Sequence, residues 1–102
     1  MRAFAELTLH DGIVRGVDRP AASELILEVD ARRNPWGPVG VFRVRFTGVR
    51  EVFGLDTLLG DVWLYEEVHL ALHGCFDYRV LFWRSDFRVI AQEVVFEEIC
   101  GS

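Results

Sequence analysis

The sequence predicts an all-β, antiparallel fold of six or seven strands, either closed into a small barrel or folded into a sandwich. Apolar and polar residues alternate with period two, β-branched and aromatic residues fill the apolar runs, and Pro/Gly-rich segments separate them. The clearest segment is Val41–Thr47, in which two phenylalanines and a valine alternate with Arg43 and Arg45. This pattern is typical of a strand that buries one face.

The other strands are predicted from similar apolar runs and from the loops between them. Pro20 marks one loop and the segment 32–38 marks another, because proline and glycine interrupt regular structure. A turn or a single helical turn is expected near residues 55–60. The remaining predicted strands are Ile13–Val17, Glu24–Ala31, Val49–Phe53, Tyr78–Trp83 and Phe87–Ile99.

The segment Asp61–His73 has two interpretations. Asp61 is a good N-cap and Gly74 a good C-terminal residue for a helix over Val62–His73. A strand explains the segment better, because five of six alternate positions are apolar, whereas a helix would spread apolar residues around its axis. We therefore predict a strand here, followed by two more in a meander.

Composition sets the size and class of the protein. A chain of 102 residues, 51% of them hydrophobic, has room for one core, which predicts a single domain over residues 1–102. The net charge of −5, with arginines and carboxylates interspersed, disfavours nucleic-acid binding. The chain lacks the roughly 18-residue apolar run of a membrane helix and a signal sequence, so we expect a cytoplasmic protein without membrane association. Cys75 and Cys100 fit no metal or redox motif and are expected to stay reduced.

Three segments resemble a loose group of small bacterial proteins of unknown function. The first is His10-Asp11 followed by Ile13; the others are Leu-Tyr-Glu-Glu-Val-His at Leu64–His69 and Tyr-Arg-Val-Leu-Phe-Trp at Tyr78–Trp83. The resemblance covers most of the chain after His10. It implies a small β-rich domain and implies no activity.

Two histidine–carboxylate pairs are the candidate catalytic residues. His10 and Asp11 are adjacent, and Glu67 and His69 are two residues apart on one face of a predicted strand. A carboxylate can orient an imidazole for general-base catalysis, so these pairs predict a small hydrolytic enzyme as the alternative function. On a strand, His69 and His73 lie about 13 Å apart, too far to share one metal ion. We therefore expect no metal site and no cofactor.

A loop rich in proline and glycine carries the candidate ligand-binding residues Arg32, Arg33 and Trp36. Guanidinium groups beside an aromatic face are suited to an anionic or planar ligand. The alternative is that the tryptophan covers the core, with the arginine side chains lying across it.

The main functional prediction is a non-catalytic binding or protein-interaction module that forms a homodimer. Val94–Ile99 is apolar on both faces and is predicted to extend beyond the strand it pairs with, so it needs a cover. The cover is either an N-terminal strand such as Phe4–Leu9 or a second copy of the chain across a two-fold axis. One face of the C-terminal meander, which includes Leu81 and Ile90, is also more apolar than a solvated face should be. The residues assigned to the interface are Trp63, Tyr65, Trp83, Val94 and Phe96.

A five-residue hairpin loop at His73–Asp77 sets the predicted register of the meander. In this register Glu66 lies opposite Arg84 at the rim of the core. Opposite charges that face each other across a sheet attract, so a contact between these two side chains is expected.

Overall fold

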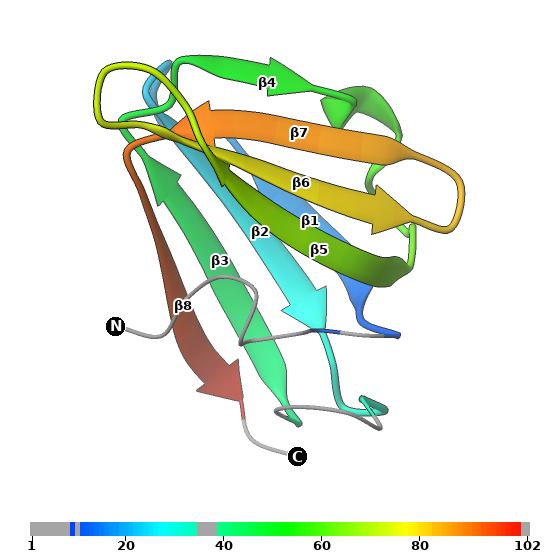
Figure 1. Ribbon diagram of the computed structural model, residues 1–102. Helices are drawn as coiled ribbons and strands as arrows, with labels where there is room; N and C mark the ends of the chain where they lie inside the picture. The colour runs from blue at the N-terminus through cyan, green and yellow to red at the C-terminus, as the bar shows by residue number, and fades with distance from the viewer. Residues whose placement is uncertain (1–8, 10, 35–38, 101–102) are drawn as a thin grey trace.

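Eight strands form two antiparallel sheets in the part of the chain that the computed structural model describes, which is Leu9, residues 11–34 and residues 39–100 except for the Cys100 side chain. The first sheet has, in spatial order, β1 (Ile13–Asp18), β2 (Glu24–Asp30), β3 (Val41–Thr47) and β8 (Glu93–Cys100). The second sheet has β4 (Glu51–Phe53), β7 (Asp86–Ala91), β6 (Phe76–Phe82) and β5 (Trp63–Leu70). The sheets form two layers whose strands run at an angle to each other (Figure 1).

The all-β, antiparallel fold class is confirmed, but the prediction of six or seven strands is wrong. That prediction treats Phe87–Ile99 as one strand, whereas the chain leaves the second sheet after Ala91 and enters the first at Glu93. At this corner Gln92 donates its backbone N–H to the carbonyl of Thr47 at 3.0 Å. Within the described residues each sheet keeps two edge strands, so the architecture is an open sandwich and not a closed barrel.

The expectations for residues 55–60 and 61–73 are confirmed. A short 3-10 helix spans Leu55–Thr57, and β5 pairs with β6 from Trp63 to Leu70 as a strand. None of the helical residues that the structure describes belongs to a segment long and apolar enough to span a bilayer.

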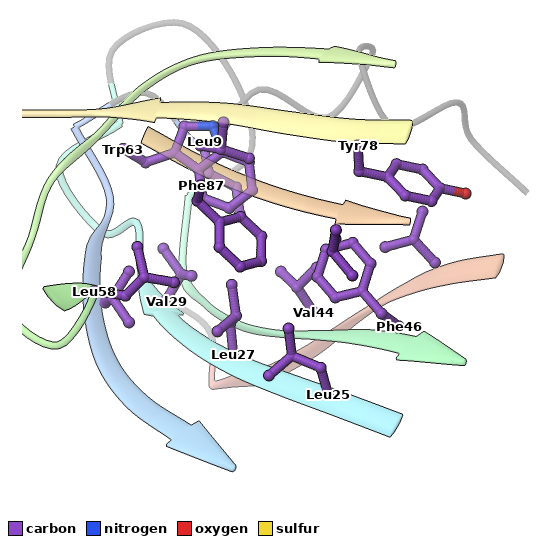
Figure 2. Packing of buried hydrophobic residues seen from close by; sticks show 14 of the residues in the cluster. Leu9, Leu25, Leu27, Val29, Val44, Phe46, Leu58, Trp63, Tyr78 and Phe87 are labelled. Atoms are coloured by element: carbon purple, nitrogen blue, oxygen red, sulfur yellow. The ribbon is translucent and has the colours of Figure 1, made fainter. Parts of the chain in front are cut away.

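The core is built around a row of aromatic rings between the sheets. Trp63 and Phe82 lie 5.6 Å apart between ring centroids, and Phe82 lies 6.2 Å from Phe87. Phe87 in turn lies 6.2 Å from Phe46 of the first sheet. Aromatic pairs at about 4.5–7 Å attract beyond their burial alone. Figure 2 shows Leu27 of the first sheet facing Phe87, so the row joins the two layers.

Trp63 lies in this core, so its prediction as an interface residue is wrong. Strict alternation places Trp63 and Tyr65 on the same face of the strand. In the structure Trp63 lies opposite Phe82 and Tyr65 lies opposite Leu81, which marks a β-bulge at this point of β5. Because the bulge adds one residue, it turns Trp63 inward and Tyr65 outward.

The predicted role of the C-terminal strand is also corrected. From Glu93 onward β8 is aligned with β3, so Val94–Ile99 does not overhang β7. Val94 is buried in the core, and Phe96 is half-buried and packs against it. These two residues fill this chain's own core because the corner at Gln92 transfers the strand to the other sheet.

The hairpin between β5 and β6 has a different register from the one predicted. Its loop is residues 71–75, closed by a hydrogen bond from the Ala71 N–H to the Cys75 carbonyl at 3.0 Å. Glu66 consequently lies opposite Val80 and is buried, so the predicted contact with Arg84 is wrong. Cys75 is buried and carries a free thiol.

Candidate functional site

The structure describes both residues of one predicted catalytic pair and one residue of the other. His10 lies outside the described residues. Asp11 is an exposed turn residue with a left-handed φ of 64°, and its backbone N–H donates to the carbonyl of Trp63 at 2.9 Å. Glu67 and His69 do meet, with Oε1 and Nε2 3.4 Å apart, and both side chains are about half exposed. The pair that lies within the described residues is therefore formed, on an open face of β5.

The predicted ligand loop borders a hollow of about 500 Å³ lined by Arg32, Arg33, Asp11 and Asp30. Trp36 lies outside the described residues. Arg32 is engaged by its own chain, because its Nε and Nη2 donate to the two oxygens of Asp30 at 2.9 and 2.6 Å. This pairing lowers the pKa of Asp30 to about 2, chiefly through the side-chain hydrogen bond. Arg32 of this loop therefore uses hydrogen-bond donors within its own chain.

The outer face of the second sheet, meaning the side turned away from the first sheet, gathers polar groups around Asp77. Its carboxylate is almost fully buried and accepts a hydrogen bond from the Nε of Arg88 at 2.9 Å and from the Nη2 of Arg79 at 2.9 Å. The Arg88 guanidinium also lies over the ring of Phe53, 5.4 Å from its centroid. The network joins β4, β7 and β6 and fixes the position of both arginines.

Ionisation of Asp77 is favoured by this arrangement. Burial alone opposes the charge, but the hydrogen bonds and charges of Arg88 and Arg79 outweigh it and hold the pKa of Asp77 below its ordinary value. A buried carboxylate with two arginine partners keeps its charge at neutral pH.

One end of this face is an aromatic patch, defined as Tyr65, Leu81 and Trp83. Tyr65 lies directly opposite Leu81 on the neighbouring strand, and Trp83 follows Leu81 by two residues. Their exposed fractions are 58%, 48% and 73%. Single exposed apolar side chains are ordinary, but three neighbours that include tryptophan and tyrosine form a surface suited to binding.

Asp61 fixes the position of Trp83 in this patch. The Trp83 N–H donates to the Val62 carbonyl at 2.8 Å, and the next N–H, of Arg84, donates to the buried Asp61 carboxylate at 3.0 Å. Burial works against the charge of Asp61, but the backbone N–H groups of Val62 and Arg84 and the Ser85 hydroxyl donate to its carboxylate and lower its pKa. The turn that presents Trp83 is therefore held to the start of β5.

A shallow hollow of about 430 Å³ adjoins the aromatic patch. It is lined by Tyr65 and Leu81 together with two arginines and two carboxylates: Arg79, Arg88, Glu67 and Asp86. The face thus presents aromatic surface beside charges of both signs. Among the described residues, His, Cys, Asp and Glu do not gather in a group of three that could hold a metal ion.

Sequence reasoning identified Tyr65 and Trp83 but missed Asp61 and Asp77. The sequence predicts Asp61 only as the cap of an alternative helix, and the predicted hairpin loop His73–Asp77 contains Asp77. A signal for Asp77 was available, because Arg79 follows it by two residues and residues so spaced share one face of a strand.

These features define the class: an antiparallel, two-sheet β protein with a charged network and an aromatic patch on the outer face of one sheet. The chain belongs to the family DUF4085, described as a protein of unknown function, which it matches over residues 2–90. The resemblance to a group of unknown function is thereby confirmed. No curated protein and no solved structure matches the chain.

Proposed function

We propose that the protein is a non-catalytic interaction module that self-associates through the outer face of its second sheet. The observation that carries the proposal is the aromatic patch, in which Tyr65 lies opposite Leu81, Trp83 follows Leu81 by two residues, and all three are about half exposed or more. Tryptophan, tyrosine and arginine dominate the binding energy of protein interfaces. Their side chains bind most strongly when a partner removes them from water.

A second copy of the chain suits this surface. In a two-fold dimer the same surface of both copies meets, so the surface must complement itself. The hollow beside the aromatic patch carries the cations Arg79 and Arg88 and the anions Glu67 and Asp86. Because both signs are present on one surface, each copy can offer an opposite charge to the other.

The proposal keeps part of the interface predicted from the sequence and replaces the rest. Tyr65 and Trp83 remain at its centre. Trp63, Val94 and Phe96 contribute to the core that supports the sheets. The contact is therefore between sheet faces and does not use the edge of the C-terminal strand.

Analytical ultracentrifugation over a range of micromolar concentrations tests the proposal. The wild-type protein is expected to sediment at about twice the 11.7 kDa chain mass at the higher concentrations. Trp83→Arg is expected to return it to a monomer, because it places an extra charge at the centre of the contact.

Val17→Arg is the matched control, since Val17 is an exposed apolar residue of β1 in the other sheet and lies beside Ile26 and Arg45. It should leave the mass of the dimer unchanged. A wild-type protein that stays monomeric up to about 100 μM would overturn the proposal.

A further inference from the structure

A second hollow, of about 540 Å³, lies at the other end of the second sheet, where the loop between β5 and β6 stands beside the start of β4 (Figure 1). We propose that it binds a small carboxylate that carries an apolar tail. The proposal does not rest on self-association. Arg88 lines both hollows, but Arg50, Leu70 and Leu72 do not line the hollow beside the aromatic patch, and Leu70 is five residues along β5 from Tyr65, or about 17 Å.

The apolar wall of the hollow is unusually exposed. Leu70 and Leu72 are 84% and 80% exposed, the highest fractions among the large hydrophobic residues that the structure describes. Ile90 of β7 lines the same hollow and is half-buried. An alkyl chain lying against these residues removes apolar surface from water on both sides, which favours binding.

The cationic wall is supplied by Arg50 and Arg88. Arg50 is exposed at the start of β4, and among the described residues its side chain has no ion-pair or hydrogen-bond partner. Arg88 is held in place by Asp77 and by Phe53. A guanidinium group binds a carboxylate through two parallel hydrogen bonds, and Arg50 has its donors available for this.

The two carboxylates of the hollow set the charge that the ligand should have. Asp77 is already engaged by Arg79 and Arg88, so it does not compete for Arg50. Glu51 also lines the hollow and repels an anion. The lining arginines Arg50 and Arg88 balance the two carboxylates, and Arg79, which pairs with Asp77 from outside the lining, adds one positive charge. A net charge of one suits a ligand with a single negative charge rather than a phosphate with two.

The size of the hollow also fits this ligand class. Small-molecule sites commonly enclose roughly 300–1,000 Å³ and combine apolar walls with a few placed polar groups. This hollow has both features, because Arg50 precedes β4 and Arg88 lies on β7, whereas Leu70 ends β5 and Leu72 lies in the β5–β6 loop. The charged head and the apolar tail of one ligand can therefore be contacted at the same time.

Isothermal titration calorimetry with octanoate tests the proposal. Octanoate is expected to bind at least tenfold more tightly than octanamide, which lacks the charge, and than acetate, which lacks the tail. Arg50→Gln should weaken octanoate binding about tenfold. Glu51→Gln should strengthen it several-fold, because it removes the repulsive charge.

Two further variants test whether octanoate binds specifically at this hollow. Arg33→Gln, at an exposed arginine far from this hollow, should leave octanoate binding unchanged. Leu72→Ser should weaken octanoate binding at least fivefold without altering the fold, as judged by circular dichroism, since Leu72 is exposed.

A peptide ending in Gly-Leu-Leu with a free carboxylate distinguishes the two sources of such a ligand, a fatty acid and a protein C-terminus. Arg50-dependent binding of either probe supports the proposal, and the tighter probe identifies the source. Equal binding of octanoate and octanamide, or no octanoate binding at millimolar concentration, would overturn it.

Discussion

The outer faces of the two sheets contain similar kinds of residues but arrange them differently. On the first sheet, charges pair between neighbouring strands: Arg15 Nε lies 3.0 Å from Glu28 Oε2, and Arg45 Nη2 lies 3.7 Å from Glu97 Oε1. On the second sheet, two arginines converge on the single buried carboxylate of Asp77. The charges of the first sheet are distributed over its outer face, which is therefore uniformly solvated. The charges of the second sheet gather at Asp77, so other residues occupy the rest of its outer face.

The apolar residues on the two faces show the consequence. On the first sheet, Ile26 and Val95 lie on either side of Arg45, and both are half-buried. The aliphatic part of an arginine can cover such neighbours. On the second sheet, Leu81 lies between Tyr65 and Asp86 and stays about half exposed. Among the described residues, the most exposed apolar side chains on strands therefore belong to the second sheet.

The largest expected effect comes from separating β4 from the second sheet. β4 ends at Phe53, which lies beneath Arg88, and the next residue, Gly54, has a left-handed φ of 77°. A Cβ atom at Gly54 would lie 2.1 Å from the carbonyl oxygen of Asp86, so the backbone must move. We expect Gly54→Ala to lower the free energy of unfolding by well over the roughly 1–2 kcal/mol that the left-handed conformation alone costs.

Gly60→Ala is the matched control for this prediction. Gly60 has a similar φ of 83°, but a Cβ there would meet no atom within 4 Å. Only the conformational cost of roughly 1–2 kcal/mol is expected. Chemical denaturation measures both variants, and equal losses would show that the approach of β4 to β7 is not tight.

A smaller effect is expected from neutralising the central carboxylate of each face. Asp77→Asn should lower the free energy of unfolding at pH 7 by about 2 kcal/mol, because it weakens charged hydrogen bonds to both arginines. Glu28→Gln on the first sheet should lower it by less than about 1 kcal/mol, as is usual for exposed ion pairs. Losses of equal size would contradict the distinction between converging and spread charges.

The pH dependence of the Asp77→Asn effect follows from its pKa. The pKa of Asp77 is lowered from 3.8 on folding, so its charge stabilises the protein above that value. This contribution is lost as the pH falls through the folded-state pKa. The difference between the wild type and Asp77→Asn, followed by urea denaturation from pH 7 downward, should therefore shrink below about pH 4.

Much of the fold could be predicted from local patterns. The strand Val41–Thr47 is observed with its predicted bounds, because one face is apolar along its whole length. The bulge in β5 could not be predicted, since it adds one residue without a glycine or proline to mark it. The corner at Gln92 was missed because apolar residues continue on both sides of it.

The candidate site could be predicted only where it depended on residue type. Tyr65 and Trp83 could be predicted because they are aromatic residues on one face of the meander, and that face is more apolar than a solvated face should be. Asp77 depends on a contact with Arg88, eleven residues away on the next strand, so its role follows from the register. With the hairpin loop placed at His73–Asp77, the sequence could not bring these two residues together.

The central claim is that the outer face of the second sheet is covered by a second copy of the chain. Hydroxyl-radical footprinting read by mass spectrometry tests it residue by residue. As the concentration of the protein rises, modification of Trp83 and Tyr65 should fall several-fold, while modification of Val17 on the first sheet stays constant. Constant modification of Trp83 and Tyr65 at every concentration, or protection of Val17 instead, would contradict the account.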